Sequence, residues 1–133
     1  MADRIQFELV SPERLLLSQA VEMVVLPGAE GDFGALPEHA PTVAALRPGV
    51  ISVFENGQVT ERVFVAGGFA EVTPECCTVL AERALRVAEL DRAGAEKAIA
   101  DARDDLADAK TDAARAAAEN EIAVGEAAIA AME

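Results

Sequence analysis

The N-terminal part of the chain alternates apolar and polar residues with a period of two, which is the pattern of half-buried β-strands. In the first segment the apolar side chains are those of Ile5, Phe7 and Leu9. The same pattern predicts strands at residues 5–10, 15–26 (two strands or one bent strand), 50–54, 59–65 and 76–81. Short strands at this spacing, with no helical period among them, predict an antiparallel β-sandwich or flattened barrel.

Two glycine-containing pairs mark turns between these strands. Asn56-Gly57 separates two of the predicted strands and favours a two-residue type I′ hairpin turn. Gly67-Gly68 predicts a second tight turn, because glycine accepts the positive φ angles that such turns require. The adjacent Cys76 and Cys77 lie on a predicted strand and therefore point to opposite faces, so one buried and one exposed free thiol are expected.

The pattern becomes helical near residue 87. From there to residue 133 the chain has no proline and is dominated by alanine. Small and apolar residues recur at steps of four and three in two seams, Ala95, Ile99, Ala102, Leu106, Ala109 and then Ala118, Ile122, Gly125, Ile129, Met132. Because the two seams do not join in register, a turn is predicted at residues 110–112. Thr111 or Asp112 would cap the second helix, and Asp91 the first.

These patterns together predict an α+β protein. Residues 1–86 would form the β-sandwich domain and residues 87–133 an antiparallel αα-hairpin domain. Few large apolar side chains are available to hold the two helices together, so burial stabilises them little. Two interpretations of the hairpin therefore stay open: a static brace and a movable arm.

Composition and charge narrow the function classes. The net charge is −13 and the pI about 4.4, which argues against an unassisted nucleic-acid role. No run of about 18 apolar residues is present, so no membrane-spanning helix and no direct insertion are expected. Residues 1–4 lead straight into a strand-like segment, which predicts no signal peptide and a protein that stays in the cytoplasm unless a partner holds it at a membrane.

Candidate chemistry is sparse, and no catalytic residue, metal or cofactor is expected. His39 is the only histidine and has no nucleophile near it in sequence, so it is interpreted as a loop or interface residue. The glycines at 28, 31 and 34 are not followed by Gly-Lys-Ser/Thr, which excludes a P-loop. Asp104, Asp105 and Asp108 form an acidic patch that is interpreted as a solvated helix face, with a weak divalent-ion site as the alternative.

The segment Glu30–Gly49 is the most constrained part of the sequence. Glycine and proline crowd its first half, at Gly31, Gly34, Pro37 and Pro41, and such residues fix backbone turns. We interpret the segment as a rigid surface loop, and rigid surface loops often carry a protein's contacts.

This segment carries a resemblance to a known family. The run Gly-Asp-Phe-Gly-Ala-Leu-Pro-Glu-His-Ala-Pro at 31–41, followed by Leu-Arg-Pro-Gly at 46–49, resembles the signature of the epsilon subunit of bacterial rotary ATP synthases, called delta in mitochondria. Residues 7–13 resemble the family's opening strand and turn, residues 65–72 its paired-glycine hairpin, and residues 78–82 its closing strand. The resemblance covers about the first 85 residues.

The resemblance implies a non-catalytic rotor subunit that clamps the gamma subunit to the ring of c subunits and couples proton flow to ATP synthesis. Residues that match the family's ring contact are Glu30, Gly31, Asp32 and Phe33. Residues that match a segment near the gamma contact are His39, Ala40, Pro41 and Thr42. The implied location is the cytoplasmic face of the bacterial inner membrane, as a peripheral part of the complex. In some members the hairpin also reaches the catalytic alpha/beta head and inhibits hydrolysis.

A second function stays open because part of this family binds ATP at the start of the helical hairpin, through a Leu-Asp-x-x-Arg-Ala pattern. Here Leu90-Asp91-Arg92-Ala93-Gly94-Ala95 places glycine where that arginine is expected, and Arg92 comes two residues early. Asp91, Arg92 and Arg103 are the candidate nucleotide ligands for an ATP-sensing regulatory subunit that extends its hairpin to inhibit hydrolysis. A third alternative is a small-ligand-binding β-barrel with an apolar cavity.

Overall fold

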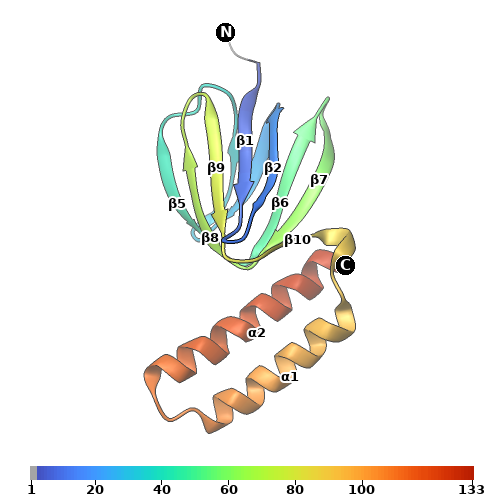
Figure 1. The fold of residues 1–133 in the computed structure, drawn as a ribbon. Coiled ribbons are helices and arrows are strands. Elements are labelled where there is room, and N and C mark those ends of the chain that lie inside the picture. Colours follow the sequence, from blue (N-terminus) through green and yellow to red (C-terminus); the bar gives the residue numbers. More distant parts are fainter. Residues whose placement is uncertain (1–2) are drawn as a thin grey trace. The chain divides into compact units, whose positions relative to one another are not determined.

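The structure is a computed structural model that describes residues 3–133 and divides into two compact units, one ending at Val87 and the other spanning Ala88–Glu133. The first is a curled β-sandwich and the second a pair of antiparallel helices, which confirms the predicted fold class (Figure 1). No helix among the described residues is long and apolar enough to cross a membrane.

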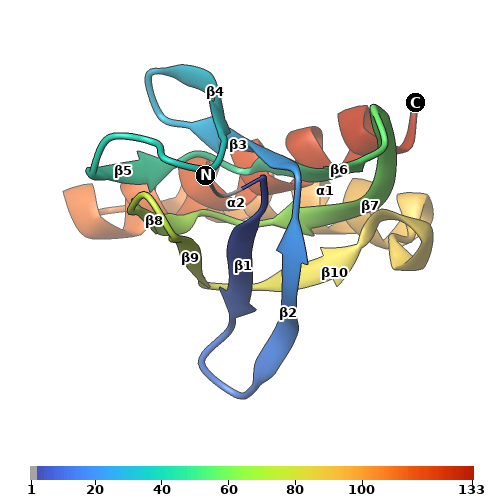
Figure 2. The same ribbon diagram turned by 90° about the horizontal axis from the view of Figure 1, so that it is seen from above.

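The strands of the first unit form one continuous curled sheet. Their bounds are β1 Ile5–Val10, β2 Leu15–Val21, β3 Met23–Gly28, β4 Gly31–Ala35, β5 Thr42–Leu46, β6 Gly49–Glu55, β7 Gln58–Val65, β8 Gly68–Val72, β9 Cys76–Ala81 and β10 Ala84–Arg86. The order is β10-β7-β6-β3-β5-β8-β9-β1-β2, with β4 paired to β3. The pairs are antiparallel as predicted, except that β1 and β9 are parallel. Viewed from above, the strands wrap around a common interior (Figure 2).

The apolar residues of the alternating pattern are the ones that the β-sandwich buries. On β1 the side chains of Ile5, Phe7 and Leu9 are fully buried, while the residues between them are half-exposed. The core also contains residues of other long strands, namely Val21, Val24, Leu26, Ile51, Val53, Val63, Val65, Val72 and Val79. Because these side chains fill the interior, the alternative of a barrel that encloses a small ligand is not favoured.

The two predicted turns have different outcomes. Asn56 and Gly57 have φ angles of 52° and 73°, which confirms the type I′ turn between β6 and β7. Gly67-Gly68 does not close a hairpin, because β8 pairs with β5 and β9 and not with β7. A Cβ on Gly68 would lie 2.1 Å from the carbonyl oxygen of Leu80, so glycine is needed where the backbone passes this close to a neighbouring strand.

The interpretation of Glu30–Gly49 as a rigid loop is wrong for most of its length. Gly31–Ala35 is strand β4, which pairs with β3 around a two-residue turn, and Thr42–Leu46 is strand β5. Glycines and prolines hide both strands in the sequence, yet Gly31 and Gly34 fit because β4 pairs on only one side along this path. Strand β8 and the short strand β10 were also not predicted from the alternation.

The cysteines lie as predicted on the two faces of β9. Cys77 is fully buried and Cys76 is half-buried, and both are free thiols. Burial raises the pKa of the Cys77 thiol to about 12, with the neighbouring Cys76 adding to the shift. The thiol of Cys77 therefore stays protonated and unreactive at neutral pH.

In the second unit, α1 spans Arg92–Asp108 and α2 spans Asp112–Met132, after a short 3₁₀ helix at Val87–Glu89. Of the two predicted caps, Thr111 caps α2, its hydroxyl accepting a 3.0 Å hydrogen bond from the backbone N–H of Ala114. Asp91 occupies the cap position of α1, but its side chain accepts no capping hydrogen bond. The predicted seams meet where a Cβ on Gly125 would lie 2.5 Å from Cγ1 of Ile99.

Candidate functional site

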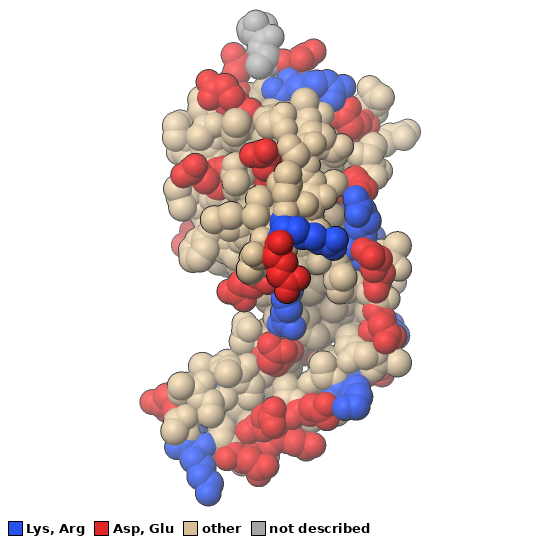
Figure 3. Space-filling model, in the orientation of Figure 1, with Lys and Arg blue, Asp and Glu red and all other residues tan. Residues whose placement is uncertain are grey.

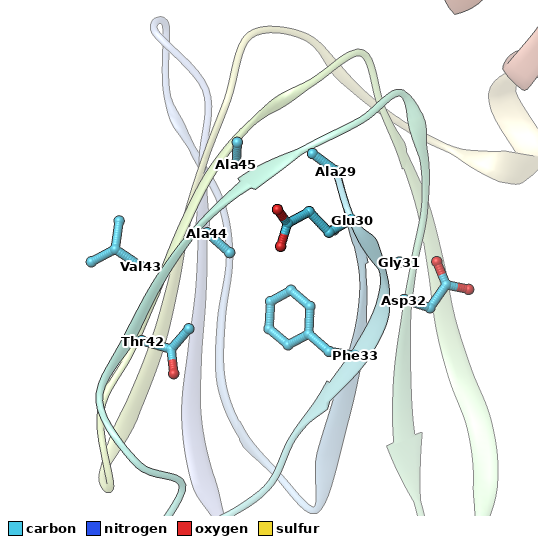
Figure 4. Close-up of a pocket in the computed structure, with 10 residues that line it drawn as sticks. Ala29, Glu30, Gly31, Asp32, Phe33, Thr42, Val43, Ala44 and Ala45 are labelled. Carbon is cyan, nitrogen blue, oxygen red and sulfur yellow. The ribbon is translucent and has the colours of Figure 1, made fainter.

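The candidate contact residues from the constrained segment gather around the β3–β4 hairpin. Ala29 and Glu30 form its turn, Gly28 pairs with Gly31, and Asp32 and Phe33 continue into β4. A cleft of about 580 Å³ separates this hairpin from β5 and is lined by Gly28, Ala29, Glu30, Gly31, Asp32, Phe33, Thr42, Val43, Ala44 and Ala45. Five of the eight predicted contact residues, namely Glu30, Gly31, Asp32, Phe33 and Thr42, therefore share one cleft (Figure 4).

Arg47 holds the hairpin against β5. Its guanidinium donates to the backbone oxygen of Gly28 at 2.6 Å and to Oδ1 of Asp32 at 2.5 Å. Its backbone N–H also donates to the oxygen of Pro27 at 2.9 Å, and the N–H of Ala29 donates to the oxygen of Ala45 at 2.8 Å. Four hydrogen bonds thus fix the hairpin from one side, which makes its tip a rigid feature of the surface.

The remaining predicted contact residues lie in the loop between β4 and β5. His39, Ala40 and Pro41 do not line the cleft. The backbone N–H of His39 donates to the oxygen of Leu36 at 3.1 Å, and its Nδ1 lies 2.6 Å from the oxygen of Ala40. Glu38 has a φ of 66° and its N–H donates to the oxygen of Pro74 at 2.8 Å, which ties this loop to the start of β9. His39 is thus a half-buried loop residue without a catalytic partner in its hydrogen bonds.

An exposed apolar row crosses the outer face of five adjacent strands. Strand register aligns Ala45 on β5, Phe69 on β8, Leu80 on β9, Val10 on β1 and Leu15 on β2. We call these residues the outer apolar row. Phe69, Leu80 and Leu15 are 59%, 58% and 56% exposed. Val43, 72% exposed, extends the row on β5. Large apolar side chains that are contiguous and exposed are typical of a protein interface.

The candidate nucleotide ligands do not converge on a basic site. Arg92 pairs with Glu96 at 3.5 Å, on the exposed surface of α1. Arg103 lines a cleft between α1 and α2, together with Glu96, Ile99, Glu126 and Ile129. Two carboxylates beside one guanidinium oppose the binding of a triphosphate. Within residues 3–133 no group of three His, Cys, Asp or Glu side chains is placed to hold a metal ion, Asp104, Asp105 and Asp108 included.

Sequence reasoning missed two features of this surface. Arg47 contacts Asp32 from 15 residues away, and nothing local in the sequence indicates that pairing. The outer apolar row needs the register of five strands, so it appears only when the sheet order is known. A signal was present in two of these strands, because Phe69 and Leu80 occupy positions where the alternation predicts a polar residue.

Comparison with known families gives two adjacent matches along the sequence. The family model described as ATP synthase, Delta/Epsilon chain, beta-sandwich domain matches residues 4–87. The model for the C-terminal domain of the ATP synthase epsilon chain matches residues 91–132. The ATP synthase epsilon chain of Rhodospirillum rubrum is 62% identical over 90 residues, covering 68% of this chain and 67% of that one. That of Granulibacter bethesdensis is 58% identical over 94 residues, covering 71% and 70%.

Solved structures show the same fold. One subunit of the Euglena gracilis mitochondrial ATP synthase, solved as OSCP/F1/c-ring in rotational state 1, matches with a TM-score of 0.84 and 26% identity over all of this chain and 84% of that one. One subunit of the Tetrahymena thermophila mitochondrial ATP synthase, from a structure of the central stalk and c ring, matches in fold, with a TM-score of 0.67 and 14% identity over 97% and 96%.

Proposed function

Because this protein belongs to the delta/epsilon family of ATP synthase subunits, we propose that it clamps the gamma subunit to the c ring and so couples proton flow to ATP synthesis. As a member of the epsilon family it is a non-catalytic subunit of the central stalk of the ATP synthase. We also propose that it is a peripheral part of the complex at the cytoplasmic face of the bacterial inner membrane.

The observation that carries the proposal is the outer apolar row. Phe69 pairs across the sheet with Leu80 on one side and Ala45 on the other, and the three side chains face outward together. Burial of such a surface against a partner stabilises the complex by about 25 cal/mol per Å² of apolar area. We assign this face to gamma, in place of the shorter segment His39–Thr42. Val43 would form its edge on β5.

The second contact of the clamp is the β3–β4 hairpin, which we assign to the ring. Arg47 fixes this hairpin, and a rigid projection transmits torque better than a mobile loop. Tagging the protein and recovering it from native bacterial membranes tests the association that the clamp requires. We expect gamma and the c subunit to be recovered with it, and recovery of neither would refute the clamp.

The first prediction concerns Asp32. Replacing it with arginine should lower proton-coupled ATP synthesis several-fold, because the new guanidinium would face that of Arg47 and push the hairpin from its place. ATP synthesis in reconstituted vesicles measures the effect. Asp32→Asn is the matched control, since it removes the charge without adding repulsion and should cost less. Normal synthesis by Asp32→Arg would refute the ring contact.

The second prediction concerns nucleotide. The isolated protein should bind ATP with a Kd of about 1 mM or weaker, because Glu96 and Glu126 line the cleft that holds Arg103. Titration calorimetry measures this, and micromolar binding would revive the ATP-sensing alternative. Gly94→Arg tests for gain of binding. A Cβ there would lie 2.9 Å from Oδ2 of Asp91, a flexible side-chain end that can move aside, so the variant should fold.

The third prediction concerns inhibition of hydrolysis. Residues 112–133 contain one basic residue, Arg115, against five acidic ones, and acidic side chains form patches on the visible surface of the helical unit (Figure 3). If inhibition requires α2 to meet an acidic segment of the catalytic head, like charges would oppose it. Truncation after Lys110 should therefore leave ATP hydrolysis by the purified complex nearly unchanged. A several-fold rise would show that the acidic helix inhibits.

A further inference from the structure

One carboxylate in the cleft beside the β3–β4 hairpin has no partner. Glu30 lies on the exposed turn of the hairpin. Within residues 3–133 its side chain makes no hydrogen bond and no ion pair. Asp32 is different, because Arg47 already neutralises it. The net charge that the hairpin offers to a partner is therefore the negative charge of Glu30.

The same cleft contains an aromatic ring. Figure 4 shows the Glu30 carboxylate and the Phe33 ring directed into the cleft, whereas Asp32 and Val43 point away from it. The ring packs closely over the backbone of the hairpin, since a Cβ on Gly28 would lie 3.0 Å from its Cδ1. Phe33 is also only half-buried, so part of its surface faces the open space. Ala44 and Thr42 of β5 form the opposite wall.

We propose that this cleft is a receptor for a single arginine side chain of a protein partner. The carboxylate of Glu30 would accept two parallel hydrogen bonds from the guanidinium, and the Phe33 ring would stack against its plane. Guanidinium fits this pair of groups better than an ammonium, because it is planar, less strongly hydrated and able to bind a carboxylate through two nitrogens. The short side chains of Ala29 and Ala44 leave the room that the guanidinium needs.

The inference deepens the proposed function, on which it depends for the partner's identity. If the hairpin faces the c ring, the arginine belongs to the ring's polar loops. Arg47 leaves the receptor open for a partner. Its guanidinium is hydrogen-bonded to Gly28 and Asp32 and would lose both bonds if it reached across to Glu30.

The test uses the whole ¹⁵N-labelled protein and three small probes followed by NMR. N-acetyl-arginine amide should shift the amide signals of Glu30, Phe33 and Ala44 in a saturable way. N-acetyl-lysine amide should bind about threefold more weakly. N-acetyl-citrulline amide, which has the same shape without the charge, should cause no shift at these residues.

Variants identify the groups that bind. Glu30→Gln should weaken the arginine probe about fivefold, and Phe33→Leu about threefold. Glu71→Gln is the control, because it removes one exposed negative charge from β8, outside the cleft, and should leave binding unchanged. The amide signals of Asp32 and Arg47 report whether each variant keeps the hairpin in place.

Equal binding of citrulline and arginine, no effect of Glu30→Gln, or equal weakening by Glu71→Gln would each overturn the receptor. No shift with the arginine probe up to its solubility limit would do the same. Recovery of gamma and the c subunit with the tagged protein is a separate result. If they are recovered while the probe does not bind, the receptor is refuted and the clamp stands.

Discussion

Replacing Phe69 by glutamate is expected to release this protein from the ATP synthase. Phe69 lies between Ala45 and Leu80 in the outer apolar row and is 59% exposed. In a complex it would be buried, and the variant would lose the apolar contact and place an unpaired carboxylate in the interface. Together these cost about 4 kcal/mol, or roughly a thousandfold in affinity. Washed membranes should keep the wild-type protein and lose the variant.

A matched control separates loss of contact from loss of fold. Val59 is also an exposed apolar residue, 45% exposed, but it lies on β7, away from the row. Val59→Glu should be retained like the wild-type protein. Both variants should unfold at nearly the same temperature as the wild type, because exposed substitutions change stability by only about 0.5 kcal/mol. Retention of Phe69→Glu in the complex would refute the assignment of this face to gamma.

Strands with clear alternation could be predicted from the sequence, and those without it could not. Residues 5–10 and 76–81 appear as strands with the predicted bounds, because burial on one face imposes the period of two. Strand β4 has two glycines in five residues, and β5 reads Thr-Val-Ala-Ala-Leu, so neither alternates clearly. Pairing with β3 and β8 makes them strands, and such long-range pairing leaves no local signal.

The helical unit was more accessible to prediction because its contacts are local. The predicted seams contain the buried Ile99 and Ala102 of α1 and the buried Ala118 and Gly125 of α2, but the other buried residues of α2, Val124, Ala128 and Ala131, lie outside the second seam. Thr111 and Asp112 were the two predicted caps of α2, and Thr111 forms the capping bond. The spacing of residues along one helix determines which of them share a face, so the sequence contains this information.

The candidate site lies between these two cases. The resemblance pointed to Glu30–Phe33, and the structure places those residues on a projecting hairpin. It could not show that Asp32 is neutralised by Arg47, since that pair depends on how β3 and β5 meet. The resemblance also gave no reason to treat Glu30 differently from Asp32. Of these two residues, only Asp32 has an ion-pair partner in the described part of the protein.

Replacing Gly125 by leucine is expected to open the helical hairpin. A Cβ at this position would lie 2.5 Å from Cγ1 of Ile99 and 3.4 Å from the oxygen of Ala95, so a larger side chain forces α1 and α2 apart. Overpacking of this kind costs about 1–3 kcal/mol. Amide hydrogen exchange should become faster throughout α1 and α2 while the amides of the β-sandwich keep their protection.

Two further variants test whether the contact between Ile99 and position 125 accounts for the separation of α1 and α2. Ile99→Ala in the Gly125→Leu background exchanges large for small across the seam and should restore much of the protection. Ala123→Leu adds the same side chain at an exposed position of α2 and should change little. Wild-type exchange rates in Gly125→Leu would contradict a close-packed seam.

The opened variant also separates the two interpretations of the hairpin. A movable arm that inhibits would spend more time extended in Gly125→Leu, and ATP hydrolysis by the complex would fall. A static brace would leave hydrolysis unchanged and lower only thermal stability. Because residues 112–133 are acidic and offer few large apolar anchors, we expect hydrolysis to stay within about twofold of the wild-type rate, a difference of roughly 0.4 kcal/mol in activation free energy. A steeper fall would show that extension of the hairpin controls the enzyme despite its charge.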